Sequence, residues 1–171
     1  MTRLSAAFGA LFAGMAALAA MLLLAMVCVV TADILLRNLS RGGFIWANEV
    51  SEIALYLMSL LVAPWLLRRG QHVRLDLILG IVPPRLAWLM EAVGDALGIA
   101  VSAVMLRYGL AMTFESWRTG SITIKNLVFP EWWLLAPLPV VFALLALEFA
   151  FRLHRLLHGA RQPRTEATSV G

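Results

Sequence analysis

Two pairs of acidic residues have types and spacing that could support chemistry. Glu49 and Glu52 stand three residues apart, and Glu91 and Asp95 stand four apart, so each pair shares one side of a helix. Paired carboxylates can serve as general acid and base, or can carry ions through a membrane protein. No nucleophile or histidine lies at a useful sequence distance from Glu49 and Glu52, and the Gly-x-Ser-x-Gly, P-loop and His-Glu-x-x-His motifs are absent. We therefore expect a protein that is not an enzyme.

Histidines on facing helices inside a four-helix membrane bundle can bind b-type haem, and this chain has three histidines. His72 follows a predicted helix, and His154 and His158 lie beside arginines near the end of another. These positions are typical of solvated helix ends. The single cysteine, Cys28, allows no intrachain disulfide and no cysteine-based metal site. We expect no cofactor and no metal.

Four long apolar stretches position these side chains. The 171 residues are 61% hydrophobic and 14% charged, and the apolar residues are gathered in blocks. Blocks of about twenty apolar residues cross a bilayer core as helices, so the sequence predicts an all-α membrane protein. We expect one membrane domain over residues 1–171, with transmembrane helices at about 6–33, 44–68, 85–114 and 131–157 and a polar tail at 159–171.

The basic residues predict the orientation of these helices. The formal net charge of +4 does not indicate nucleic-acid binding, because the arginines flank the apolar blocks as topology signals do. The N-terminus, the link between the second and third helices, and the C-terminal segment carry nine basic residues: Arg3, Arg68, Arg69, Arg74, Arg85, Arg152, Arg155, Arg161 and Arg164. The other two links carry four: Arg37, Arg41, Arg118 and Lys125. This bias predicts that both termini are cytoplasmic.

The third predicted helix carries the deepest charges. Counted from Arg85, Glu91 lies about 9 Å along the axis and Asp95 about 15 Å. Acidic residues at such depth are functional candidates, unless they lie near the headgroups or pair with an arginine on a neighbouring helix. Arg107 lies near the far end of this predicted helix, where its side chain can snorkel to water.

Several short patterns predict local contacts. Glu49 and Glu52 occupy the first turns of their helix, where the helix dipole favours acids, and Arg37 and Arg41 are near enough in sequence to pair with them. Glu148 and Arg152 stand at i and i+4 and are expected to pair.

Three further features are expected to pack against protein or to lie at the membrane surface. They are the polar face of Glu52, Tyr56 and Ser59, the close-packing stripe of Gly94, Gly98 and Ser102, and an amphipathic interfacial segment at 72–81.

Motifs at both ends of the second helix, and at the start of the fourth, resemble a known family. They are Phe44-x-Trp46-x-x-Glu49, then Arg69-Gly70-Gln71-His72-Val73-Arg74-Leu75-Asp76 and Pro83-Pro84, and later Gly120-Ser121, Phe129-Pro130-Glu131-Trp132 and Pro137-Leu138-Pro139. Together they resemble the small membrane subunit of tripartite ATP-independent periplasmic (TRAP) transporters, over roughly residues 8–157.

The resemblance implies a non-enzymatic scaffold in the bacterial inner membrane. Such a subunit pairs with a large permease subunit, and a periplasmic binding protein delivers a carboxylate, such as a C4-dicarboxylate or a sialic acid. A sodium gradient drives transport, and the large subunit moves like an elevator. The family motif corresponds to Trp46, Glu49, Gly70, His72, Asp76 and Pro130 of this sequence, which are then expected to shape the fold and the subunit contact.

Two other functions compete with the scaffold hypothesis. One is a stand-alone small transporter that uses Glu91 and Asp95 for ion coupling, and the other is a haem-bearing electron-transfer subunit. Under the scaffold hypothesis, Glu52, Gly94 and Gly98 join the motif residues as expected contact positions. The remaining expected partner is membrane lipid.

Overall fold

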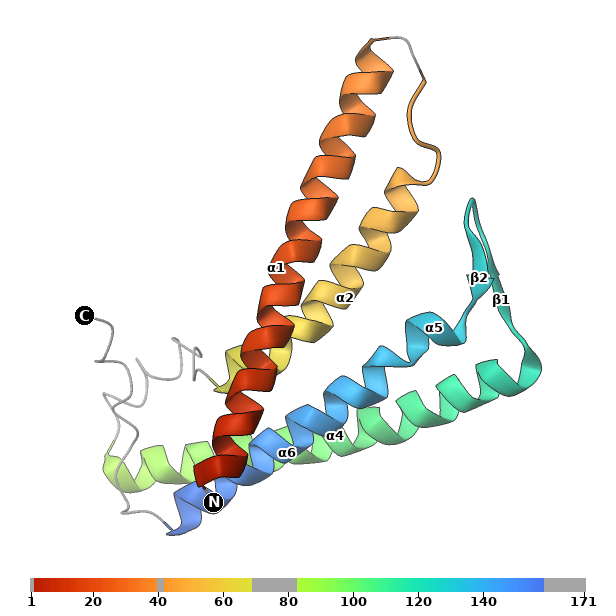
Figure 1. The fold of residues 1–171 in the computed structure, drawn as a ribbon. Helices are drawn as coiled ribbons and strands as arrows, with labels where there is room; N and C mark the ends of the chain where they lie inside the picture. The colour runs from red at the N-terminus through yellow and green to blue at the C-terminus, as the bar shows by residue number, and fades with distance from the viewer. Residues whose placement is uncertain (1, 40–41, 69–82, 159–171) are drawn as a thin grey trace.

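A computed structural model describes residues 2–39, 42–68 and 83–158 of the chain (Figure 1). Within these ranges it has four helices that are long and apolar enough to cross a membrane, which confirms the predicted all-α membrane fold. The elements are α1 (Thr2–Asn38), α2 (Ala47–Arg68), α4 (Pro84–Thr119), β1 (Ile122–Ile124), β2 (Val128–Pro130), α5 (Trp132–Leu135) and α6 (Pro137–His158). The predicted interfacial segment at 72–81, the motif residues Gly70, His72 and Asp76, and the tail at 159–171 lie outside the described residues.

The helix boundaries differ from the predicted ones for identifiable reasons. α2 begins at Ala47 rather than at residue 44, because residues 45 and 46 form a turn before it. α4 continues past residue 114 to Thr119, where Gly120 adopts a left-handed conformation with φ of 66° and its N–H donates to the Ser116 carbonyl. The predicted helix at 131–157 is divided into α5 and α6 at Pro137, which has no N–H to continue the ladder.

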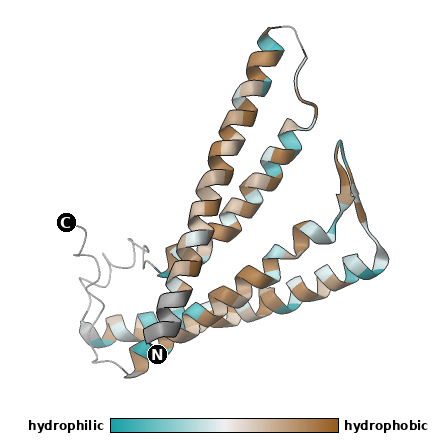
Figure 2. Ribbon diagram, in the orientation of Figure 1, coloured by the Kyte–Doolittle hydropathy of each residue, from teal (hydrophilic) through white to brown (hydrophobic). Residues whose placement is uncertain are grey.

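Two helical hairpins form the molecule. α1 packs on α2 and α4 packs on α6, while α2 and α6 join the two pairs (Figure 1). The packing order is therefore α1–α2–α6–α4, and within the described residues α1 and α4 do not pack extensively on each other. Among the described residues, α4 therefore packs mainly on α6 rather than on α2. An open arrangement of this kind leaves much of each helix surface available to lipid or to another protein, and this surface is largely apolar (Figure 2).

The contact between α4 and α6 follows a seven-residue repeat. Asp95, Ser102, Gly109 and Ser116 are spaced by seven and are all buried. A seven-residue period keeps one seam of a helix facing its partner, and small residues on that seam let membrane helices approach closely. A Cβ built on Gly109 would stand 2.5 Å from a Leu138 methyl carbon, so the two backbones are close at this level.

The segment between α4 and α5 is more ordered than the polar loop that the sequence suggested. β1 and β2 pair antiparallel, with Ile122 opposite Pro130 and Ile124 opposite Val128. The hairpin stands at the end of the α4–α6 pair and reaches toward the start of α2 (Figure 1). It therefore bridges the two helical hairpins at the end where they diverge.

Candidate functional site

Glu49 holds the β-hairpin against α2. Its two carboxylate oxygens accept hydrogen bonds from the backbone N–H groups of Asn126 (2.7 Å) and Leu127 (2.8 Å), in the turn between β1 and β2. The Asn126 side-chain amide donates to the Ile45 carbonyl at 3.2 Å, just before α2. Hydrogen bonds that a carboxylate accepts are stronger than neutral ones, so this is a firm anchor between segments 77 and 78 residues apart.

A surface ion pair lies next to this anchor. Lys125 Nζ lies 2.9 Å from a Glu52 carboxylate oxygen, and both side chains are at least half exposed. The hydrogen bond with Glu52 and its negative charge raise the pKa of Lys125, so the lysine stays charged at neutral pH. Glu49 and Glu52 therefore both have structural partners, as their position in the first turns of the helix indicated.

The predicted partners of these acids are engaged elsewhere. Arg37 pairs with Asp33 at 2.8 Å, one turn earlier in α1. The other oxygen of Asp33 accepts the N–H of Phe44 at 2.5 Å, which fixes the link that leads to α2. The expectation that Arg37 pairs with Glu49 or Glu52 is therefore wrong, and Arg41 lies outside the described residues.

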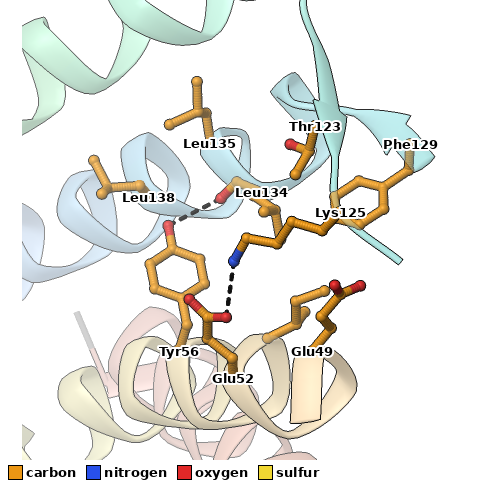
Figure 3. A pocket seen from close by; sticks show the side chains of 10 residues that line it. Glu49, Glu52, Tyr56, Thr123, Lys125, Phe129, Leu134, Leu135 and Leu138 are labelled. Carbon is orange, nitrogen blue, oxygen red and sulfur yellow. Dashed lines mark hydrogen bonds and ion pairs between the residues drawn. The ribbon is translucent and has the colours of Figure 1, made fainter. Parts of the chain in front are cut away.

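A pocket of about 350 Å³ lies between α2, the β-hairpin and the helices that follow it (Figure 3). Tyr56 donates its hydroxyl to the Leu134 carbonyl at 2.9 Å, and this bond ties α2 to α5. The walls are mostly apolar, and Glu49, Glu52 and Lys125 are the charged side chains among the lining residues. Glu52 and Tyr56 of the predicted polar face thus meet the hairpin and α5 of the same chain, whereas Ser59 is exposed.

Trp46 and Pro130 belong to the same end of the molecule. Trp46 stacks on Phe44 with ring centroids 5.0 Å apart, immediately before α2. Pro130 closes β2 opposite Ile122, immediately before α5. These two positions and Glu49 therefore all lie at the junction between the β-hairpin and the helix starts.

A cluster of charged residues joins three helices at the opposite end. Arg152 of α6 lies 3.2 Å from Asp95 of α4, and both side chains are largely buried. Glu148, also of α6 and 2% exposed, lies 3.4 Å from Arg68 of α2 and 3.5 Å from Arg155. The expected pair of Glu148 with Arg152 is therefore not the one observed. Arg152 pairs with Asp95 of α4, and Glu148 pairs with Arg68 of α2 and with Arg155 of its own helix.

The same cluster satisfies backbone groups at helix ends. The last carbonyls of a helix have no partner within it. Arg152 donates to the Leu67 carbonyl of α2 at 3.1 Å, and Trp88 donates its indole N–H to the Leu156 carbonyl of α6 at 3.2 Å.

The two acidic candidates of the third predicted helix lie on α4 near this cluster. Glu91, one turn before Asp95, is partly buried. Asp95 thus lies in a structural ion pair, as one of its two sequence interpretations expected.

The two candidate contact glycines lie in different surroundings. A Cβ on Gly98 would stand 2.5 Å from the Phe149 ring, so Gly98 lies within the packed contact between α4 and α6. In the described part of the chain, nothing lies within 4 Å of a Cβ placed on Gly94, which is exposed. The predicted stripe is therefore split, and only Gly94 is open to a partner.

The arrangement of these groups holds helices together. Among the described residues, no group of three or more histidine, cysteine, aspartate or glutamate side chains could hold a metal ion. His154 is exposed near the end of α6, and His72 and the His158 side chain lie outside the described residues.

The β-hairpin was not predicted from the sequence, although its β-branched residues at 122–124 are typical of a strand.

A family comparison decides the identity of the chain. Residues 26–159 match the family described as "Tripartite ATP-independent periplasmic transporters, DctQ component". The chain belongs to the DctQ family. The match includes Glu49, the β-hairpin and the charged cluster, and it confirms the resemblance to the small TRAP subunit. Curated proteins give no match to this DctQ chain.

Membership in the DctQ family states the coarse function. The chain is the small permease component of a TRAP transporter and a multi-pass membrane protein. The family is one of transporter components and not of enzymes, and its members work with a large permease and a substrate-binding protein.

Proposed function

We propose that this DctQ component is the stationary scaffold of a sodium-driven importer for carboxylate substrates. Its partners are a large permease subunit that carries substrate and ions, and a periplasmic binding protein that delivers the substrate. It resides in the bacterial inner membrane with both termini in the cytoplasm, as the arginine distribution predicts. C4-dicarboxylates, sialic acids and other sugar acids are the substrate classes to test.

The use of its charged residues supports the scaffold role. Asp95, Glu148 and Glu49 are each buried and each bind a different element of the same chain. A residue that carries an ion or a proton must exchange its partner during transport, whereas these residues hold α2, α4, α6 and the hairpin in fixed relation. This set of buried contacts between elements is the single observation that favours a scaffold over a moving, substrate-binding part.

The exposed surface supports a subunit that packs against another membrane protein. Four small residues of α1 are exposed in the described structure: Ala10, Ala13, Gly14 and Ala17. Nothing among the described residues lies within 4 Å of a Cβ placed on Gly14. Small residues let a second helix approach closely in lipid, so these positions are available for a subunit contact.

The pairing of Asp95 argues against the stand-alone transporter. Its carboxylate faces Arg152, so an ion would have to displace a buried arginine. The haem alternative gains no support from His154, which lies exposed near a helix end rather than opposite another histidine within the described bundle.

Reconstituted uptake tests the proposal. Proteoliposomes would contain the large permease subunit with or without this chain, and substrate-loaded binding protein would be added with an inward sodium gradient. We expect uptake when both subunits are present, and none from this chain alone. Sodium-coupled uptake by this chain alone, lost in an Asp95→Asn variant, would establish the stand-alone transporter instead.

A further inference from the structure

Arg107 is a charged residue in the middle of a membrane helix. α4 continues for twelve residues beyond it to Thr119, so the sequence-based placement near the helix end is wrong. The residue is exposed, and within the described residues it makes no ion pair. Arginines 37, 68, 152 and 155, in contrast, all lie near a carboxylate.

Contacts of α4 near its two ends give reference levels for the position of Arg107 along the helix. At one end Asp95 pairs with Arg152 in the charged cluster, and at the other Ser116 donates to Glu131, which is exposed before α5. The 21 residues from Asp95 to Ser116 span about 32 Å, close to the thickness of a bilayer core. Arg107 is twelve residues from the first level and nine from the second, so it lies about 18 and 14 Å from them. An arginine side chain cannot snorkel that far.

Arg107 also points away from the rest of the chain. Gly109 lies on the seam with α6, and two residues correspond to about 200° around a helix, so Arg107 is on the opposite face. Lipid tails offer no hydrogen-bond acceptor, and an ionised residue at this depth is found facing protein or water. The exposed face of α4 at this level is therefore expected to meet another protein or water rather than lipid tails.

The residues around Arg107 indicate what kind of partner fits. Four exposed alanines share this face, and together with Arg107 they follow one another at spacings of three or four residues: Ala96, Ala100, Ala103 and Ala111. Small side chains at these spacings let the backbone of a second membrane helix come close. A guanidinium within such a contact binds a carboxylate best, because two parallel hydrogen bonds and opposite charge combine.

We propose that Arg107 and the surrounding alanine face of α4 bind a membrane helix of the large permease subunit that presents a carboxylate at mid-membrane depth. This rests on the proposed scaffold function and specifies which face of the small subunit meets its partner. Because α6 packs on the opposite face of α4, α4 would lie between α6 on one side and the permease helix on the other.

Charge variants test the role of the guanidinium in the native membrane. Arg107→Leu should lower recovery of the large subunit at least tenfold in mild detergent, while Arg107→Lys should retain a substantial part of it. Arg118→Leu is the matched control, because Arg118 is exposed in the last turn of the same helix, where water is close. Unchanged recovery with Arg107→Leu would overturn the proposal. Membrane levels of each variant separate loss of contact from loss of folding.

Site-specific crosslinking tests the surface without altering Arg107. A photoreactive residue at Ala103 or Ala111 should capture the large subunit, whereas one at exposed Leu24 of α1 serves as the comparison position. Capture of a second copy of this chain, or of lipid alone, in a complex that contains the large subunit would overturn the proposal and leave the scaffold function intact. If the unaltered chain recovers no large subunit at all, the scaffold function itself fails.

Discussion

At the scale of single residues, acidic side chains that looked suited to chemistry are structural. Glu49 and Glu52 stand one turn apart in α2, yet they bind in different ways. Glu49 is buried and accepts two backbone N–H groups, whereas Glu52 makes an exposed pair with Lys125. The helix-dipole argument predicted acids at this position, but the partners of Glu49 could not be predicted. They are backbone N–H groups 77 and 78 residues away. Every residue except proline has such a group, so the sequence does not indicate which of them bind Glu49.

The two glutamates should therefore differ in their contribution to stability. Glu49→Leu removes the acceptor of two part-buried N–H groups, and a hydrogen bond to a charged group contributes about 1.5–3 kcal/mol. Glu52→Leu removes an exposed pair of a kind that contributes about 0–1 kcal/mol. We expect a clear fall in the thermal melting temperature of the detergent-purified chain for Glu49→Leu and a shift of a few degrees at most for Glu52→Leu. Equal shifts would show that the hairpin anchor is unimportant.

Variants of Asp95 test whether this residue has a structural role or a transport role. Removing one partner of a buried ion pair costs about 3–5 kcal/mol, because the other charge is left uncompensated. Asp95→Asn should therefore lower the melting temperature of the purified chain, and Asp95→Arg combined with Arg152→Asp should recover part of the loss. A variant that keeps its stability but loses sodium-coupled uptake would contradict the structural assignment.

At the scale of elements, the helices could be predicted and the contacts between them only in part. Long apolar blocks require helices in lipid, so the number and approximate positions of the helices follow from the sequence. The sequence-based stripe of Gly94, Gly98 and Ser102 has a four-residue spacing, whereas the buried seam against α6 has a seven-residue spacing and shares only Ser102 with that stripe. The β-hairpin has only three residues per strand, and its position depends on Glu49, so local pattern could not place it.

Gly94 and Gly98 should respond differently to the same substitution. Gly98→Ala would push a methyl group against the Phe149 ring, and overpacking of this kind costs about 1–3 kcal/mol. Gly94→Ala meets nothing among the described residues and should leave the melting temperature of the isolated chain nearly unchanged. Combining Gly98→Ala with Phe149→Leu should relieve part of the clash. No rescue by the smaller side chain would argue against this α4–α6 packing.

At the scale of the whole molecule, the chain is two helical hairpins held at both ends. Charged contacts of Arg68, Glu148, Asp95 and Arg152 join α2, α4 and α6 at one end, and the Glu49 anchor joins the hairpin to α2 at the other. Much of the helix surface between these ends is exposed and apolar. These contacts and this exposed surface are the basis of the proposed stationary role beside a larger permease subunit.

Topology is the whole-molecule property that the arginine distribution predicts. A reporter that is active only in the periplasm should be inactive when fused to the C-terminus and active when inserted after Lys125, in the hairpin turn. A reporter that is active only in the cytoplasm should give the reverse pattern. Periplasmic activity of the C-terminal fusion would contradict cytoplasmic termini and would place the charged cluster at the outer surface.

Recovery of the subunit complex tests the scaffold account most directly. The unaltered chain would be purified in mild detergent from its native membrane, and the proteins that accompany it would be quantified by mass spectrometry. The account predicts a large polytopic membrane protein in near-equal amount, with Arg107→Leu reducing that amount and Arg118→Leu leaving it unchanged. Recovery of the chain alone in more than one detergent would contradict the scaffold account.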